Sequence, residues 1–283
     1  MRILLATDGS TNADVALNVV LHRPWEDGTV VKVITVVEPL HSRINKVIGL
    51  FGLAKTAEEA QKRLFQVCKD LMKRYKDALD EKFGAANVSA EIVEGRPREK
   101  IVEIAKEWNA DVVMLGAHGH SRSESTEFLH GVVPEFVLAH APCSVELVRL
   151  IAPRTMVTEI QRKQPVEEDK YLVALDDSEC SAATLNAILA RKWPAGCYFN
   201  LISIAETLTV QAYSGLGPWE GAGSEEYAEL VERTTEAEHN TAEKVLADAA
   251  EKIRAAFPDA HVTAEILEGY PRDRIVSFAK EWP

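Results

Sequence analysis

The chain has 283 residues, enough for two domains, and its 46% hydrophobic and 27% charged residues are typical of a soluble globular protein. Its formal net charge of −12 argues against general binding to nucleic acid or to an anionic membrane, because phosphate surfaces attract clusters of lysine and arginine. A local anion site built from backbone N–H groups is still compatible with that charge.

Short apolar runs alternate with helical patterns along the chain, which predicts parallel sheets covered by helices. In the first half we expect strands at residues 3–7, 30–36, 88–93, 111–115 and 144–148, and helices at 11–22, 56–83, 97–108 and 130–140. In the second half we expect strands at 171–175, 198–204 and 261–267, and helices at 179–191, 224–256 and 271–282. The charged, proline-containing segment 151–169 is the expected linker between domains 1–150 and 170–283.

The two halves are related by an internal repeat. The run Ala-Thr-Asp-Gly-Ser around Asp8 recurs 168 residues later as Ala-Leu-Asp-Asp-Ser around Asp176. After a six-residue insertion, residues 88–108 match residues 262–282 with 14 of 21 positions identical. A match of this length at a fixed offset indicates duplication. Because the second copy ends where the first continues for 40 residues (109–148), we expect it to lack a fourth strand, phosphate loop, fourth helix and fifth strand, and the sequence to be a fragment of a longer chain.

The cysteines and the start of the chain bear on location. Cys68, Cys143, Cys180 and Cys197 form no C-x-x-C pair and lie in apolar patterns, so we interpret them as buried thiols of a reducing compartment. Met1 leads directly into a predicted strand, without the apolar segment of a signal peptide. The cytoplasm is therefore the expected location. The spacing of the histidines matches no common metal-ligand pattern, and no metal is expected.

Candidate binding residues of the first copy lie where predicted strands end, which is where open parallel sheets bind ligands. Asp8 follows the first strand, and its carboxylate can accept hydrogen bonds from a ribose. Val36 ends the second strand, where backbone groups can meet the edge of an adenine. Gly116 and Gly119 follow the fourth strand and Gly131 opens the fourth helix, so backbone N–H groups there can bind an anion.

These residues carry a resemblance to a known family. The strand ending Ala-Thr-Asp-Gly-Ser, the glycines at 116, 119 and 131, and the run His-Ala-Pro-Cys-Ser-Val at 140–145 resemble a universal stress protein domain. The resemblance implies two Rossmann-like doubly wound α/β domains in tandem, of the adenine nucleotide alpha-hydrolase-like type. It implies ATP or AMP as ligand of the first domain, with Mg²⁺ accompanying ATP. The binding residues it implies are Ala6, Thr7, Asp8, Val36, Gly116, His118, Gly119, Arg122, Gly131 and Val132.

The loop before the fourth helix departs from the pattern of the ATP-binding members, which have nine residues between the second and third glycines and then a serine or threonine. Here eleven residues separate Gly119 from Gly131, and Val132 follows, so that hydroxyl is missing. The loop also carries Glu124 and Glu127, whose charge Arg122 partly offsets.

Three functions are compatible with these residues. The favoured one is a stress-response protein that binds an adenine nucleotide and catalyses no reaction, since enzyme motifs such as G-x-x-x-x-G-K-[ST] and H-E-x-x-H are absent from the sequence. The second is a nucleotide-free scaffold for an unknown protein partner, and the third is a slow ATPase. Members of the family pair through their fifth strands, so the segment 144–148 predicts a homodimer.

Overall fold

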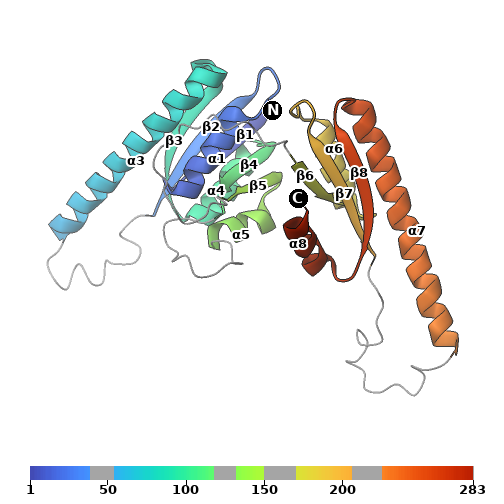
Figure 1. Ribbon diagram of the computed structural model, residues 1–283. Helices are drawn as coiled ribbons and strands as arrows, with labels where there is room; N and C mark the ends of the chain where they lie inside the picture. The colour runs from blue at the N-terminus through green and yellow to red at the C-terminus, as the bar shows by residue number, and fades with distance from the viewer. Residues whose placement is uncertain (39–53, 118–131, 150–169, 206–224, 283) are drawn as a thin grey trace. The chain divides into compact units, whose positions relative to one another are not determined.

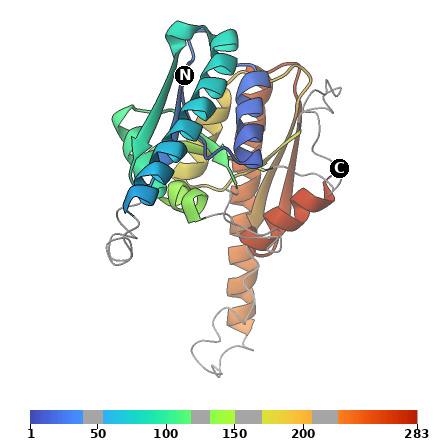
Figure 2. The same cartoon turned by 90° about the vertical axis from the view of Figure 1, so that its left-hand side faces the viewer.

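The computed structural model describes residues 1–38, 54–117, 132–149, 170–205 and 225–282. The chain divides into two compact units, Met1–Thr158 and Glu159–Pro283. Each unit contains a parallel sheet and is described separately (Figures 1 and 2). Within the described residues, no helix is both long and apolar enough to cross a membrane.

Unit 1 is built on a five-stranded parallel sheet in the order β3-β2-β1-β4-β5. The strands are β1 (Arg2–Ala6), β2 (Val30–Val37), β3 (Val88–Glu94), β4 (Val112–Gly116) and β5 (Ser144–Val148). The helices are α1 (Thr11–His22), α3 (Ala54–Phe83), α4 (Pro97–Glu107) and α5 (Val132–His140), with a 3-10 turn, η1 (Ala85–Asn87), before β3. Because the order reverses between β1 and β4, the unit has the Rossmann-like doubly wound arrangement.

The central strands of the unit 1 sheet are buried, and helices cover them on both faces. On one face, α1 and α3 cover β1 and β2 through a cluster that includes Leu17, Val20, Tyr75 and Leu79. On the other face, α4 and α5 contribute their own apolar side chains to a second cluster. β1 is buried from Ile3 to Ala6 as expected for the central strand of a parallel sheet covered by helices.

Unit 2 repeats the first part of this arrangement with a three-stranded sheet in the order β6-β7-β8. Its elements are β6 (Lys170–Ala174), α6 (Glu179–Leu189), β7 (Tyr198–Ala205), α7 (Glu225–Ala256), β8 (His261–Glu268) and α8 (Pro271–Glu281). Helices α6 and α7 cover one face through Leu185, Ile188, Leu246 and Ile253. The elements expected from the sequence are present within two residues of the expected bounds wherever the structure describes them.

The expectation for the cysteines is wrong in part. Cys68 and Cys197 are buried, whereas Cys143 is half-buried and Cys180 is exposed. Cys180 is exposed because it lies in the first turn of α6, between Ser178 and Ser181, on a surface that the core of unit 2 does not cover. An apolar pattern alone does not separate these two situations.

Candidate functional site

The end of β1 is a tight turn that leads into α1. The N–H of Thr7 donates to the carbonyl of Ile34, 2.9 Å away, which extends the pairing of β1 with β2. The N–H of Gly9 donates to Thr7 Oγ1 at 3.1 Å, and the N–H of Ser10 donates to Asp8 Oδ1 at 2.9 Å. Gly9 has a φ of 76°, a conformation that glycine adopts without steric cost. The turn thus buries Thr7 and leaves Asp8 exposed at the carboxyl edge of the sheet.

The first turn of α1 lies against the end of β4. Ser10 Oγ accepts a hydrogen bond from the N–H of Ala13 and caps the helix. A Cβ atom added to Gly116 would lie 2.8 Å from the backbone carbon of Asn12 and 2.9 Å from the nitrogen of Ala13. The absence of a side chain at Gly116 therefore has a packing role. It lets the positive end of the α1 dipole approach the edge where Asp8 lies.

The predicted binding residues are brought together only in part by the described structure. Ala6 and Thr7 are buried at the end of β1, and Asp8 follows them. Val36 lies one residue before the end of β2, and its side chain packs against the cluster under α4. Val132 is the first residue of α5 and is 62% exposed. The predicted residues His118, Gly119, Arg122 and Gly131 lie outside the described residues.

A buried tyrosine next to Thr7 was not predicted from the sequence. The hydroxyl of Tyr75, on α3, donates to Asp14 Oδ1 at 2.7 Å, and Arg74 Nη2 donates to the same oxygen at 2.9 Å. Burial raises the pKa of Tyr75, while a hydrogen bond with Thr7 acts in the opposite direction. These contacts connect α3 and α1 to the end of β1. The signal in the sequence was the spacing of Met72, Tyr75 and Leu79, which places all three on one face of a helix.

The equivalent turn of unit 2 has a different hydrogen-bonding pattern. Asp176 Oδ1 accepts from the N–H of Ser178 at 3.0 Å and from the hydroxyls of Ser178 and Ser181, each at 2.5 Å. These hydroxyls lower the pKa of Asp176. Ser181 occupies the position that Ala13 has in unit 1. The carboxylate of Asp176 therefore accepts a hydrogen bond from a hydroxyl that the alanine of unit 1 cannot supply.

Comparison with known proteins supports the assignment of unit 1. The model of the universal stress protein family matches residues 1–149. The chain belongs to the universal stress protein family. A universal stress protein of Methanocaldococcus jannaschii is 28% identical over 156 residues, which cover 52% of this chain and 94% of that protein.

Solved structures of the family extend the comparison to the fold. The crystal structure of a universal stress protein from Archaeoglobus fulgidus covers 99% of this chain and 83% of that chain, with a TM-score of 0.51 and 20% sequence identity. A family member from Arabidopsis thaliana, solved with AMP bound, covers 56% of this chain and 97% of that chain, with a TM-score of 0.36 and 15% identity. The likeness to the Archaeoglobus structure concerns the fold alone and extends over both units of the chain.

Proposed function

We propose that this universal stress protein binds an adenine nucleotide in unit 1 and catalyses no reaction on it. The observation that carries the proposal is the reversal of strand order between β1 and β4, with Asp8 and Gly116 at the two strand ends that flank the reversal. Ligands of doubly wound sheets bind at such a reversal, beyond the carboxyl ends of the strands. The exposed carboxylate of Asp8 fits a ribose there.

The two halves of a nucleotide would meet different parts of this edge. The ribose hydroxyls would donate to Asp8, and the adenine would lie beside the backbone at the end of β2, near Val36. The phosphates would be held by backbone N–H groups of Gly116, Gly119 and Gly131, with Arg122 and His118 supplying positive charge. ATP would bring Mg²⁺, and AMP would need none. Val132 lacks the hydroxyl that would contact a phosphate. Its absence favours AMP over ATP, because AMP has fewer phosphate groups to be held.

The test is native mass spectrometry of the full chain purified without added nucleotide, followed by titration with AMP and ATP. We expect a nucleotide adduct and about tenfold weaker binding in Asp8→Asn, because a charge-assisted hydrogen bond to ribose is lost. Asparagine keeps an oxygen for the N–H of Ser10 and so preserves the turn. Asp27→Asn, in the exposed turn between α1 and β2, is the control and should bind as the wild type does. Equal affinity of the wild type and Asp8→Asn would contradict the proposal.

The same variants distinguish a slow ATPase from a protein that only binds the nucleotide. If the chain only binds nucleotide, phosphate release stays at the background rate in the wild type and in Asp8→Asn. Release above background that disappears in Asp8→Asn would instead establish hydrolysis at this edge.

We further propose that unit 2 arose by duplication of unit 1. Equivalent residues make equivalent contacts in the two units. Trp25 Nε1 donates to the carbonyl of Val20 at 2.8 Å, and Trp193 Nε1 donates to the carbonyl of Ile188 at 2.8 Å. Both donors and both acceptors are separated by the repeat offset of 168. A shared hydrogen bond of this kind supports a common ancestor more strongly than composition does.

A nucleotide-free protein-interaction scaffold is the second candidate, and one observation favours it. Leu64 and Val67, one turn apart on α3, are 41% and 63% exposed. Large apolar side chains at that spacing form the kind of stripe that binds a partner. Absence of any nucleotide adduct, together with a partner whose binding is lost in Val67→Glu, would favour the scaffold over the nucleotide-binding protein.

We also propose that the protein forms a homodimer through β5. This strand is the edge of the five-stranded sheet, and all five of its residues are half-buried within one chain. A partly covered edge strand offers its backbone groups to a second copy.

A further inference from the structure

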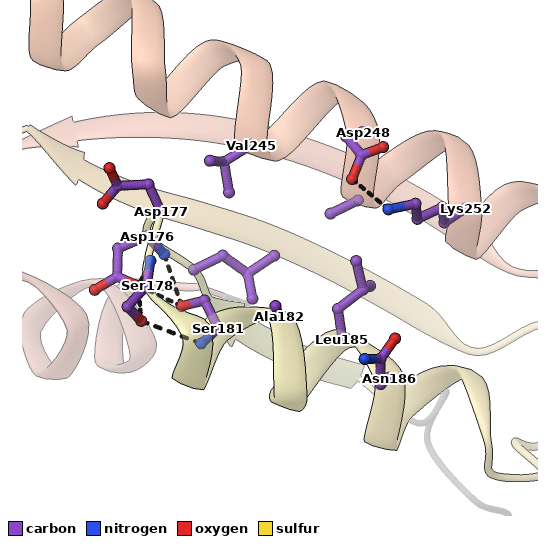
Figure 3. Close-up of a pocket in the computed structure, with 12 residues that line it drawn as sticks. Asp176, Asp177, Ser178, Ser181, Ala182, Leu185, Asn186, Val245, Asp248 and Lys252 are labelled. Atoms are coloured by element: carbon purple, nitrogen blue, oxygen red, sulfur yellow. Dashed lines mark hydrogen bonds and ion pairs between the residues drawn. The ribbon is translucent and has the colours of Figure 1, made fainter.

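Unit 2 contains a cleft at the place that corresponds, through the repeat, to the contact between Tyr75 and Asp14 in unit 1. The cleft lies between α6 and α7 at the end of β6 and has a volume of about 290 Å³ (Figure 3). Its apolar lining comes from both helices, with Leu185 on α6 and Val245 on α7. Small-molecule sites begin at about 300 Å³, so a cleft of this volume suits only a ligand at the small end of that class.

The repeat explains why the cleft exists. With the offsets of the repeat, Ala249 of α7 takes the place of Tyr75 on α3, and Ala182 of α6 takes the place of Asp14 on α1. The burial pattern supports this alignment, because Ala249 is 1% exposed and Tyr75 is 0% exposed. In unit 1 the ring and hydroxyl of Tyr75 reach across to Asp14. In unit 2 both positions are alanine, and both alanines are among the residues that line the cleft.

The side chains around the cleft define the chemistry of a ligand. Asp176, with its lowered pKa, and the exposed Asp177 lie at the end of β6, and Asp248 lies on α7. Among the described residues of the lining, Lys252 is the one lysine or arginine, and it pairs with Asp248 at 2.6 Å. Three carboxylates against one ammonium give this described part of the lining an excess of negative charge. An apolar floor next to that charge suits a ligand with an apolar body and a positive group.

We propose that this cleft binds a small organic cation whose body is an aromatic ring about the size of a tyrosine side chain. The ring would occupy the space that the ring of Tyr75 occupies in unit 1, between Leu185 and Val245. The positive group would face Asp176 and Asp177, as those residues lie at the end of the strand. The site lies within unit 2 and is independent of nucleotide binding at Asp8.

The test uses tyramine, which has a phenol ring and one ammonium, as the probe for the full chain. Titration followed by NMR or calorimetry should give saturable binding in the millimolar range or tighter. The matched probe is 3-(4-hydroxyphenyl)propionate, which keeps the ring and hydroxyl but carries a negative charge. We expect it to bind at least ~10-fold more weakly, because the lining repels an anion.

Two variants test whether tyramine binds in the cleft. Ala249→Tyr restores the side chain that fills the space in unit 1 and should weaken tyramine binding at least ~10-fold by occupying the cleft. Asp176→Asn leaves the space open and should weaken it by about 2- to 5-fold, since the removed charge is largely exposed to solvent. Ala183→Tyr is the control, because Ala183 is an exposed alanine of α6 outside the lining, and its affinity should match the wild type.

Each possible result is decisive. Selective tyramine binding that Ala249→Tyr and Asp176→Asn reduce and Ala183→Tyr does not would support the site. Absence of saturable tyramine binding at millimolar concentration would overturn it, as would equal affinity for the anionic probe. If Ala249→Tyr fails to fold, as judged by circular dichroism, unchanged binding in Asp176→Asn alone overturns the assignment of the positive group to that end.

Discussion

A side chain at position 116 would clash with the first turn of α1, so this position requires glycine. Its missing Cβ would meet backbone atoms of Asn12 and Ala13, which belong to the first turn of α1 and have little freedom to move. The sequence predicts Gly116 as part of an anion-binding loop, and the structure adds a packing reason for glycine that holds with or without a ligand.

Gly116→Ala should therefore lower the free energy of unfolding by about 1–3 kcal/mol, because the added Cβ forces α1 away from the strand. Urea denaturation measures the change. The control is Gly28→Asn, at a position with a φ of 79° and no atom within 4 Å of an added Cβ. This variant carries the strain of a positive φ but no clash, and because asparagine tolerates that conformation better than most residues, it should cost less stability than Gly116→Ala. Equal stability of Gly116→Ala and the wild type would show that α1 adjusts at no cost.

Contacts between elements hold α1 in place from two directions. Near its start, Tyr75 and Arg74 of α3 donate to Asp14. At its end, Lys82 Nζ donates to the carbonyls of Val20, Leu21 and Arg23, and burial lowers the pKa of Lys82. The repeat places an alanine, Ala256, at the position of Lys82 in unit 2. Helix α6 therefore lacks the equivalents of both contacts, which agrees with the open cleft beside it.

The burial of Tyr75 between α3 and α1 makes the free energy of unfolding depend on pH, and Tyr75→Phe should remove that dependence. Burial raises the pKa of Tyr75, so above about pH 10 an unfolded tyrosine loses its proton while the folded one keeps it. The unfolded state then binds fewer protons, and the free energy of unfolding falls as pH rises, by up to about 1.4 kcal/mol per pH unit from this group. Below about pH 10 the contribution of Tyr75 is fully present.

Tyr75→Phe should lack this part of the alkaline decline, and at neutral pH it should cost about 1 kcal/mol for the lost hydrogen bond to Asp14. Urea denaturation at several pH values between 7 and 11 measures both effects. Tyr270→Phe, which removes a hydroxyl from a side chain that is 60% exposed, is the control and should keep the full decline. An alkaline decline of the same slope in Tyr75→Phe and the wild type would refute the argument.

Most elements could be predicted from the sequence because their patterns are local. Residues 11–22, for example, combine the cap Ser10 with buried residues at helical spacing, and the structure places α1 at Thr11–His22. Pro97 similarly marks the first turn of α4. The candidate site was harder to predict, since the packing of Gly116 and the bridge from Tyr75 to Asp14 join residues up to about a hundred positions apart. The cleft of unit 2 became visible only when the repeat offset was combined with the burial of Ala249.

At the scale of the whole molecule, the edge of the sheet in unit 1 decides how copies could associate. Among the strands that the structure describes, β5 pairs with β4 and with no other. The carbonyl of Val148 accepts from the N–H of Ala117 at 2.8 Å, so the backbone groups of Val148 point toward β4. Successive residues of a strand alternate in this direction, and the N–H groups of Val145 and Leu147 therefore point away from β4, toward the open edge.

Val145→Pro tests the dimer, because the N–H group of Val145 points toward the open edge of the sheet. Proline removes an N–H that points away from β4, and so leaves the pairing of β5 with β4 intact while removing a donor that a second copy would use. Sedimentation at micromolar concentration should show a dimer for the wild type and a monomer for Val145→Pro, with the same circular dichroism spectrum. Ser89→Ala, on the opposite edge strand β3, is the control and should remain a dimer. A monomeric wild type at high micromolar concentration would rule out the dimer, and a dimeric Val145→Pro would move the interface away from β5.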